Sequence, residues 1–387
     1  MKRSRSLVLF FILIMAALAL YALWNRYGRG PGPDPGAGRA SDGPVVLALI
    51  APTRGPLEKW GQALEYGARM ALPEDAGRTS GGRAVRLVVV DESNPAALRS
   101  VVQQAGPKGI VAFVGHLTER ALLETAPSYV KASRPVLLPV LSSSRIALLG
   151  QGWFYRLMAS DESQAAALAE YAIKTLGVRK AMVVFEDSPY GRRVAEAFSR
   201  VFGPERPVDQ TPYPDKPEDL LALAEKASQS RPEAVLLALH GRPAVFVAQA
   251  LRQAEVKTTL LGTHILALSD LAPILTQLSQ RAFVSLPFYS EGGGPKGRAL
   301  VEAFESRFQR HPNWLTALAY DATNLALEAL DKGGPSPAEM KKYLDGLSST
   351  GKLYTGAAGD YRFSDGGQGN GPVRIVQTAP ALSSRLP

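Results

Sequence analysis

The sequence contains no cysteine. It therefore forms no disulfide, offers no thiolate to a metal or a substrate, and cannot be attached to a membrane through a lipid-modified cysteine. Histidine is also scarce, because His116, His240, His264 and His311 are the only four, and none has the close spacing of a metal motif such as HExxH. Neither a GxxxxGK[ST] phosphate loop nor a GxSxG nucleophile elbow occurs. The sequence thus gives no support to an enzyme and predicts no cofactor.

The net charge is +9, and part of this excess lies at the N-terminus, where Lys2, Arg3 and Arg5 open the chain. The remainder has no dense run of Lys and Arg with interleaved aromatic residues, which nucleic-acid binding would require. Nucleic acid is therefore not a predicted partner. Hydrophobic residues make up 46% of the 387 residues, which is enough for large cores and favours two domains over one.

Residues 7–24 form an unbroken apolar run of 18 residues, about the minimum that crosses the hydrocarbon core of a bilayer. The basic residues before it predict a cytoplasmic N-terminus and place the rest of the chain on the outer face. Two interpretations remain open. The segment Ala17-Leu18-Ala19 fits the cleavage site of a secretory signal, whereas Tyr21 and Trp24 suit a membrane interface and favour an uncleaved anchor. Residues 25–44 are rich in Pro and Gly and are predicted to be a linker.

From Val45 onward, short apolar runs alternate with segments of helical periodicity. Strands are expected at 45–51, 85–90, 110–114, 136–141, 181–185, 234–239, 259–261 and 282–286. Helices are expected at 57–72, 96–105, 119–131, 162–176, 190–202, 217–230, 243–254, 297–311 and 315–332. Further β-type segments are expected at 361–363 and 373–377. This alternation predicts an α/β fold with parallel sheets wrapped by helices, in which ligands bind beyond the carboxyl ends of the strands.

Several loops carry recognisable sequences. Residues 51–71 contain a Pro-x-x-Gly-Pro turn and an aromatic-Gly pair before a helix, and residues 113–144 contain a Gly-His loop and a Pro-x-x-Ser loop. Residues 183–198 combine a strand, an Asp, a Tyr-Gly pair and a helix, and residues 317–330 and 361–377 form a late helix and a final hairpin. In this order and spacing, the segments resemble the type I periplasmic binding proteins, in particular the branch that binds leucine, isoleucine and valine.

The resemblance implies two doubly wound lobes joined by crossover strands around a central cleft. Lobe 1 would comprise residues 45–157 and 288–345, and lobe 2 residues 158–287 and 346–378. Ligand would bind between the lobes and close them, which is a population shift driven by contacts made in the closed state. Proteins of this family normally deliver solutes to a permease of an ABC importer.

The resemblance also indicates candidate ligand-binding residues in lobe 1. Trp60 stands where the family places an aromatic ring over the ligand, although ordinary helix packing would also explain it. Thr118 and Glu119 occupy a loop that holds a carboxylate in the family, where Glu119 replaces a hydroxyl. Ser142 and Ser143 occupy a second hydroxyl-bearing loop and could equally serve as helix caps.

In lobe 2 the candidates are Tyr190, His240 and His264. Tyr190 matches an aromatic residue that often faces the cleft, and packing at its helix start is the alternative. His240 follows a strand and could line the same lobe. His264 falls where the family places an acid for the ligand's ammonium group, and a neutral imidazole is a weaker anchor for a cation. Both histidines could instead be structural. Asp321 is interpreted as structural.

The sequence leads to two hypotheses. The first is an extracytoplasmic receptor that supplies an importer with an amino acid or a related small polar solute. The departures at Glu119 and His264 point away from a standard branched-chain amino acid and toward an amide, a polyamine-like or an aromatic solute. The second is a sensor or scaffold of the same fold, held at the outer face of the cytoplasmic membrane by residues 7–24.

Overall fold

The computed structural model describes residues 44–72, 82–203, 205–216, 218–267, 271–279 and 281–378. The predicted membrane segment 7–24 lies outside these residues, as does all of the linker 25–44 except Pro44. Among the residues that are described, no helix combines the length and the apolar character that crossing a bilayer requires. The described residues belong to one compact unit, in which the strands form two sheets.

Eight strands of the described chain form the first sheet: β1 (Val45–Ala51), β2 (Val85–Asp91), β3 (Ile110–Gly115), β4 (Val136–Leu138), β5 (Phe154–Arg156), β11 (Tyr354–Thr355), β12 (Asp360–Ser364) and β13 (Gln368–Asn370). Their order is β11-β12-β13-β5-β4-β3-β1-β2. Strands β1 to β5 pair in parallel. The residues of β1 and β3 are apolar and almost wholly buried, as expected for a sheet covered on both faces.

Six strands form the second sheet in this part of the chain: β6 (Ala181–Phe185), β7 (Val208–Pro212), β8 (Ala234–Ala238), β9 (Thr259–Gly262), β10 (Ala282–Leu286) and β14 (Arg374–Gln377). Their order is β14-β10-β9-β8-β6-β7. All pairs are parallel except β10 with β14. The two mainly parallel sheets confirm the predicted α/β class, and antiparallel pairing occurs only at one edge of each, between β11, β12 and β13 and between β10 and β14.

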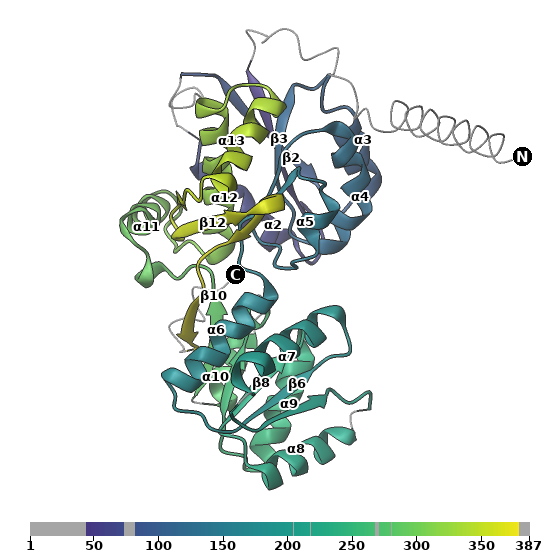
Figure 1. Ribbon diagram of the computed structural model, residues 1–387, viewed down its shortest axis with the longest axis vertical. Helices are drawn as coiled ribbons and strands as arrows, with labels where there is room; N and C mark the ends of the chain where they lie inside the picture. Colours follow the sequence, from purple (N-terminus) through teal and green to yellow (C-terminus); the bar gives the residue numbers. More distant parts are fainter. Residues whose placement is uncertain are drawn as a thin grey trace, which may run out of the picture. The chain divides into compact units, whose positions relative to one another are not determined.

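Helices cover both sheets (Figure 1). Around the first sheet lie α2 (Glu58–Met70), α3 (Pro95–Gln103), α4 (Glu119–Ala132), α5 (Ile146–Leu149), α11 (Pro295–Phe308), α12 (Trp314–Lys332) and α13 (Pro337–Ser349). Around the second lie α6 (Asp161–Lys174), α7 (Pro189–Phe202), α8 (Asp219–Ser230), α9 (Arg242–Gln253) and α10 (Leu271–Leu278). Three short 3₁₀ turns complete the described elements, namely η1 (His264–Ala267), η2 (Ser290–Gly292) and η3 (Asp365–Gly367).

Local sequence sets where many of these helices begin. The side chains of Thr118, Ser160, Ser188 and Asn313 each accept a hydrogen bond from a backbone N–H in the first turn of the helix that follows. Such caps satisfy N–H groups that have no partner within the helix. Because α4 and α7 follow β3 and β6, the caps at Thr118 and Ser188 also fix loops at the carboxyl edges of the sheets.

The longest described helix, α12, packs closely on α2. A Cβ atom added at Gly67 would lie 2.1 Å from the backbone oxygen of Thr316, so only glycine allows this approach. The Thr316 hydroxyl donates to the backbone oxygen of Ala63 at 3.1 Å. The contact holds α2, the first described helix, against α12 and fixes the position of Trp60 in α2.

The C-terminal segment corrects the expected lobe boundary. Residues 346–378 were expected in lobe 2, but β11, β12 and β13 belong to the first sheet, where Gln368 of β13 pairs with Arg156 of β5. Only β14 joins the second sheet. The physical reason is strand pairing, because the free edge of β5 is extended by β13, and the chain then crosses to the free edge of β10. The chain thus passes between the sheets three times: after β5, after β10 and after β13.

Candidate functional site

At the carboxyl edge of the second sheet, two of the predicted residues contact each other. Tyr190 lies in the first turn of α7, after β6, and its ring packs against that of His240, after β8, with centroids 4.4 Å apart. The Tyr190 hydroxyl forms a 2.6 Å hydrogen bond with Oγ1 of Thr263, which follows β9. Tyr190 is buried, whereas His240 is exposed and its ring remains accessible. The three loops after β6, β8 and β9 thus form one polar-aromatic surface.

Glu186 orients His240. Its carboxylate accepts the His240 backbone N–H at 2.9 Å and lies 2.7 Å from the ring Nδ1, and it also accepts the Ser188 hydroxyl at 2.6 Å. Burial opposes ionisation, but the His240 ring, the Ser188 hydroxyl and the His240 N–H outweigh it and lower the pKa of Glu186 to about 2. Glu186 is therefore an anion at physiological pH. It was not among the predicted residues, although its place directly after a strand is the signal that could have identified it.

His264 is buried in a polar pair. Its Nδ1 lies 2.8 Å from Oε1 of Gln164, which also accepts the Ser285 hydroxyl at 2.9 Å. The imidazole meets Trp314, at the start of α12, edge to face with centroids 5.6 Å apart. Burial lowers the pKa of His264 to about 3, so the ring is neutral at physiological pH. It therefore carries no charge with which to bind an ionic group.

In the first lobe, the predicted loops follow β1 and β3. Trp60 is half-buried and packs against the main core. The Thr118 side chain caps α4 by accepting the Ala121 N–H at 3.3 Å, while Glu119 begins that helix and is exposed. An acidic residue in a first helical turn is favoured by the helix dipole, which gives Glu119 a structural reason to be there.

A buried network holds the loop that carries Thr118. Glu92 accepts the backbone N–H groups of Leu117 at 3.2 Å and Thr118 at 3.1 Å. Its carboxylate also lies 2.9 Å from Nδ1 of His116, whose Nε2 lies 2.9 Å from the hydroxyl of Tyr129. All three side chains of this network, Glu92, His116 and Tyr129, are buried. Sequence reasoning did not identify it, because its members are separated by 13 to 24 residues.

The serine loop after β4 meets the start of α6. The Ser142 backbone oxygen accepts the Asp161 N–H at 3.1 Å, and the Ser144 hydroxyl donates to Glu162 at 2.9 Å. Arg193 of α7 lies 3.1 Å from Asp161 and 3.4 Å from Glu162. Burial raises the pKa of Asp161, against the opposing effects of the Ser142 hydroxyl and Arg193. Two lobes therefore meet at a junction of charged and hydroxyl groups.

This junction holds four buried polar atoms without a hydrogen-bond partner among the described residues. They are Ser143 Oγ, Asp161 Oδ1, Glu162 Oε2 and Arg193 Nε. Ser143 and Asp161 are each only 2% exposed. Buried polar atoms are almost always paired in native proteins, and an unpaired one costs about 1–3 kcal/mol. Arg193 Nε lies 3.4 Å from Glu162 Oε1 in an ion pair, so the junction combines buried donors and acceptors of both charge signs, of which Ser143 Oγ, Asp161 Oδ1 and Glu162 Oε2 have no partner among the described residues.

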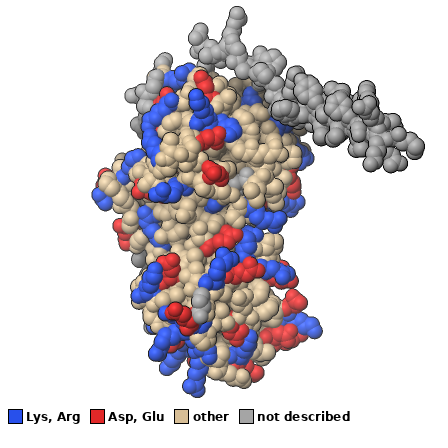
Figure 2. All heavy atoms as spheres, in the orientation of Figure 1, with Lys and Arg blue, Asp and Glu red and all other residues tan. Residues whose placement is uncertain are grey.

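No group of three or more His, Asp or Glu side chains in the described part of the chain could hold a metal ion. On the face shown in Figure 2, Lys and Arg side chains are interspersed with Asp and Glu. Aromatic rings, hydroxyls and a few charges gathered after parallel strands are features of a small-molecule-binding site.

The fold and these loops define a two-lobed binding protein, and comparison with known proteins supports the same class. A family model described as periplasmic binding protein matches residues 44–381. The chain belongs to this family. It is a small-molecule-binding receptor and not an enzyme, as expected from the sequence.

Relatives and solved structures agree with this assignment. The leucine-, isoleucine-, valine-, threonine- and alanine-binding protein of Pseudomonas aeruginosa is 22% identical over 302 residues, which cover 76% of this chain and 80% of the relative. An ABC transporter substrate-binding protein from Desulfitobacterium hafniense in complex with Leu has a TM-score of 0.74 at 22% identity, covering 89% of this chain and 99% of that one. A solute binding protein of R. palustris in complex with benzoate has a TM-score of 0.68 at 17% identity, covering 87% and 94%.

Proposed function

We propose that this protein is the solute-binding component of an ABC importer, that it works at the outer face of the cytoplasmic membrane, and that its ligand is an amino acid or a close analogue. The observation that carries the proposal is the set of four polar atoms without a hydrogen bond at the junction between the lobes. A ligand that paired them would regain free energy that the buried atoms otherwise cost, and would do so only with both lobes in contact with it.

The chemistry of the four atoms favours a zwitterion. Arg193 Nε donates and Ser143 Oγ can donate, which suits a carboxylate, whereas Asp161 Oδ1 and Glu162 Oε2 accept, which suits an ammonium group. The neutral His264 offers no such charge, so in this proposal the acids at the start of α6 bind the ammonium group. Trp60, Tyr190 and His240 would contact the rest of the ligand, and Thr118 and Ser142 would border the carboxylate.

A thermal-shift screen of residues 44–387 tests the ligand class. Leucine, threonine, phenylalanine, an amide, a polyamine and benzoate form a suitable set. A ligand at about 100 times its dissociation constant adds roughly 2.7 kcal/mol of stability and raises the midpoint by a few degrees. An amino-acid hit supports the proposal. A thermal shift with benzoate alone would contradict the proposal of a zwitterionic ligand. The absence of any shift would favour the hypothesis of a sensor or scaffold.

Replacing Ser143 with alanine tests the junction with little risk to the fold. Its hydroxyl has no partner, so its removal should leave the melting temperature unchanged or slightly higher. The affinity for the ligand found in the screen should fall about tenfold, the equivalent of one lost hydrogen bond to a charged group. Titration calorimetry of the wild type and the variant measures both affinities. Unchanged affinity in Ser143→Ala would remove this residue from the site.

We further propose that residues 7–24 anchor the protein. Full-length protein should then sediment with membranes and resist a carbonate wash, as an apolar run of 18 residues predicts. Cell fractionation with N-terminal sequencing checks this. A mature species that begins after Ala19 and appears in the soluble fraction would show that the segment is a cleaved signal.

A further inference from the structure

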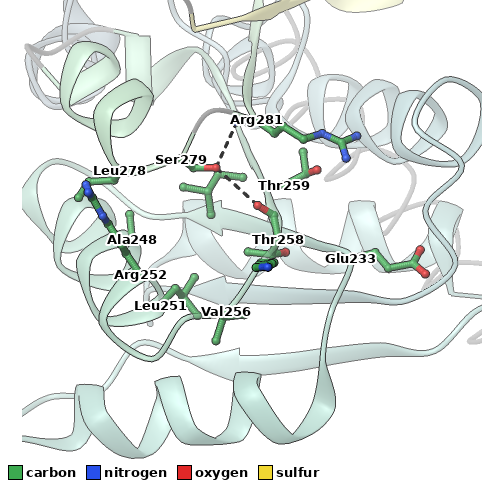
Figure 3. A pocket seen from close by; sticks show the side chains of 12 residues that line it. Glu233, Ala248, Leu251, Arg252, Val256, Thr258, Thr259, Leu278, Ser279 and Arg281 are labelled. Atoms are coloured by element: carbon green, nitrogen blue, oxygen red, sulfur yellow. Dashed lines mark hydrogen bonds between the residues drawn. The ribbon is translucent and has the colours of Figure 1, made fainter.

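A pocket lies in the second lobe, at the opposite edge of its sheet from Tyr190 and His240. It has a volume of about 570 Å³ and lies among α9, the end of α10 and the residues that precede β8, β9 and β10 (Figure 3). Its lining includes Glu233 before β8, Thr258 before β9 and Arg281 before β10. The two edges are separated by the length of the five-residue strand β8, about 17 Å. The pocket is therefore distinct from the junction described above.

The charges around this pocket are unbalanced. Arg252, Lys257 and Arg281 line it together with a single carboxylate, that of Glu233. That carboxylate accepts the backbone N–H of Arg179 at 2.7 Å and lies 3.5 Å from the Arg179 guanidinium, so its charge is already compensated from outside the lining. Arg252 donates to the backbone oxygen of Gln277 at 3.0 Å, which leaves its positive charge in place. The pocket has a net positive charge and attracts anions.

Two of these cations have no counter-ion among the residues that the structure describes. Within the described residues, neither Lys257 nor Arg281 forms an ion pair through its side chain, whereas Arg193, Arg179 and Lys226 of the same lobe each do. In Figure 3 the Arg281 and Glu233 side chains extend along one side of the pocket and Arg252 lies on the other. An anion seated between them would lie within reach of charges from two sides.

The pocket also has an apolar wall. Its members come from the second half of α9, the loop that follows it, β9 and the end of α10, and they are Ala248, Leu251, Val256, Leu260 and Leu278. Ala248, Leu251 and Leu260 belong to the main hydrophobic core and are buried, so the half-buried Val256 and Leu278, which pack against that core, present most of the accessible surface of the wall. A bare inorganic anion would leave this wall in contact with water. A ligand with both an anionic head and an apolar body would use the charges and the wall together.

A polar group in the lining points to the same kind of ligand. Oγ1 of Thr258 is buried and has no hydrogen-bond partner among the described residues. The hydroxyl of neighbouring Ser279 instead donates to the Thr258 backbone oxygen at 3.5 Å. Three cations, an unpaired hydroxyl and an apolar wall therefore occur in one concave site.

We infer that this pocket binds a small monocarboxylate with an apolar body, independently of the solute bound at the lobe junction. The carboxylate lies toward Lys257 and Arg281, and the apolar part covers the wall formed by α9 and α10. The inference does not depend on the identity of the transported solute.

The test uses 4-phenylbutyrate as probe and the full chain as the cell produces it. Titration calorimetry should detect saturable binding that weakens with added salt. Lys257→Gln and Arg281→Gln should each lower the affinity about threefold, and the double variant about tenfold, as expected for partly exposed ion pairs. Arg200→Gln is the matched control, because Arg200 is an exposed arginine of the same lobe and its loss changes the net charge equally.

Two analogues separate the contributions of charge and wall. The neutral 4-phenylbutan-1-ol and the small anion acetate should both bind at least about tenfold more weakly than the probe. The inference is wrong if the probe does not bind, if the alcohol or acetate binds equally well, or if Arg200→Gln weakens binding as much as the pocket variants. It is also wrong if Ser143→Ala abolishes binding while the pocket variants do not, since the probe would then occupy the lobe junction. None of these results bears on whether an amino acid binds at that junction.

Discussion

Replacing Asp321 with alanine should destabilise the protein by about 3 kcal/mol at pH 7. Asp321 is fully buried in α12, and its carboxylate accepts the N–H groups of Ala357 at 2.6 Å and Ala358 at 2.9 Å and the hydroxyl of Tyr361 at 2.6 Å. Orphaning three buried donors costs about 2 kcal/mol each. The alanine variant, however, no longer buries an ionised carboxylate at pH 7, which offsets about 3 kcal/mol of this cost. Urea unfolding of both proteins measures the difference.

The same residue makes stability depend on pH. Burial raises the pKa of Asp321 to about 6, although hydrogen bonds from Tyr361, Ala358 and Ala357 oppose the shift. The folded state therefore holds a proton between about pH 4 and 6 that the unfolded state, with an Asp pKa of about 3.9, has lost. The stability from this proton is complete below about pH 4 and is lost as the pH rises through 6, a total of about 3 kcal/mol.

Asp321→Asn is the matched variant, because it keeps the shape and an acceptor but cannot ionise. Its stability relative to the wild type should rise as the pH increases from 4 to 7, since only the wild type loses the contribution of the bound proton. Urea titrations at half-unit pH steps give the comparison. A constant difference between the two proteins across this range would show that Asp321 does not titrate there.

Most of the described strands and helices follow from local sequence. The apolar runs at 45–51 and 181–185 predicted β1 and β6 with their observed bounds. β7 (Val208–Pro212) was not predicted, because it is an edge strand whose residues are half-buried or exposed and make no apolar run. α13 was also not predicted, although Ser336 and Glu339 form a capping box at its start.

What the sequence could not supply is pairing between distant segments. Nothing local distinguishes β13, which joins the first sheet, from β14, which joins the second a few residues later. The same limit applies to the site. The rule that ligands bind at strand ends placed Tyr190 and His240 on one edge. The rule could not show that His264 is buried, because its partners Gln164 and Trp314 lie 100 and 50 residues away in the sequence. The ligand contacts themselves stay a prediction.

Replacing Glu92 with alanine should have the largest effect, about 4 kcal/mol, because it removes the central acceptor of a buried hydrogen-bond network. The substitution orphans three donors at once: the N–H groups of Leu117 and Thr118 and the ring of His116. As a control, Glu170→Ala removes an exposed helical pair with Lys174, which is worth about 0.5 kcal/mol or less. Urea unfolding should separate the two variants clearly.

Replacing Glu92 should also lower the affinity for ligand, because the backbone N–H groups that Glu92 binds belong to the loop that carries Thr118. Without Glu92, the backbone of residues 116–118 loses the bonds that fix it, and any affinity that depends on an ordered loop falls with it. Glu92→Gln separates the two effects, since its single carbonyl oxygen can still accept one N–H and should preserve more of the fold than alanine does. Calorimetry at a temperature where each variant remains folded should show affinity falling in the order wild type, Gln, Ala. A folded alanine variant with wild-type affinity would mean that this loop supports the lobe and takes no part in holding the solute.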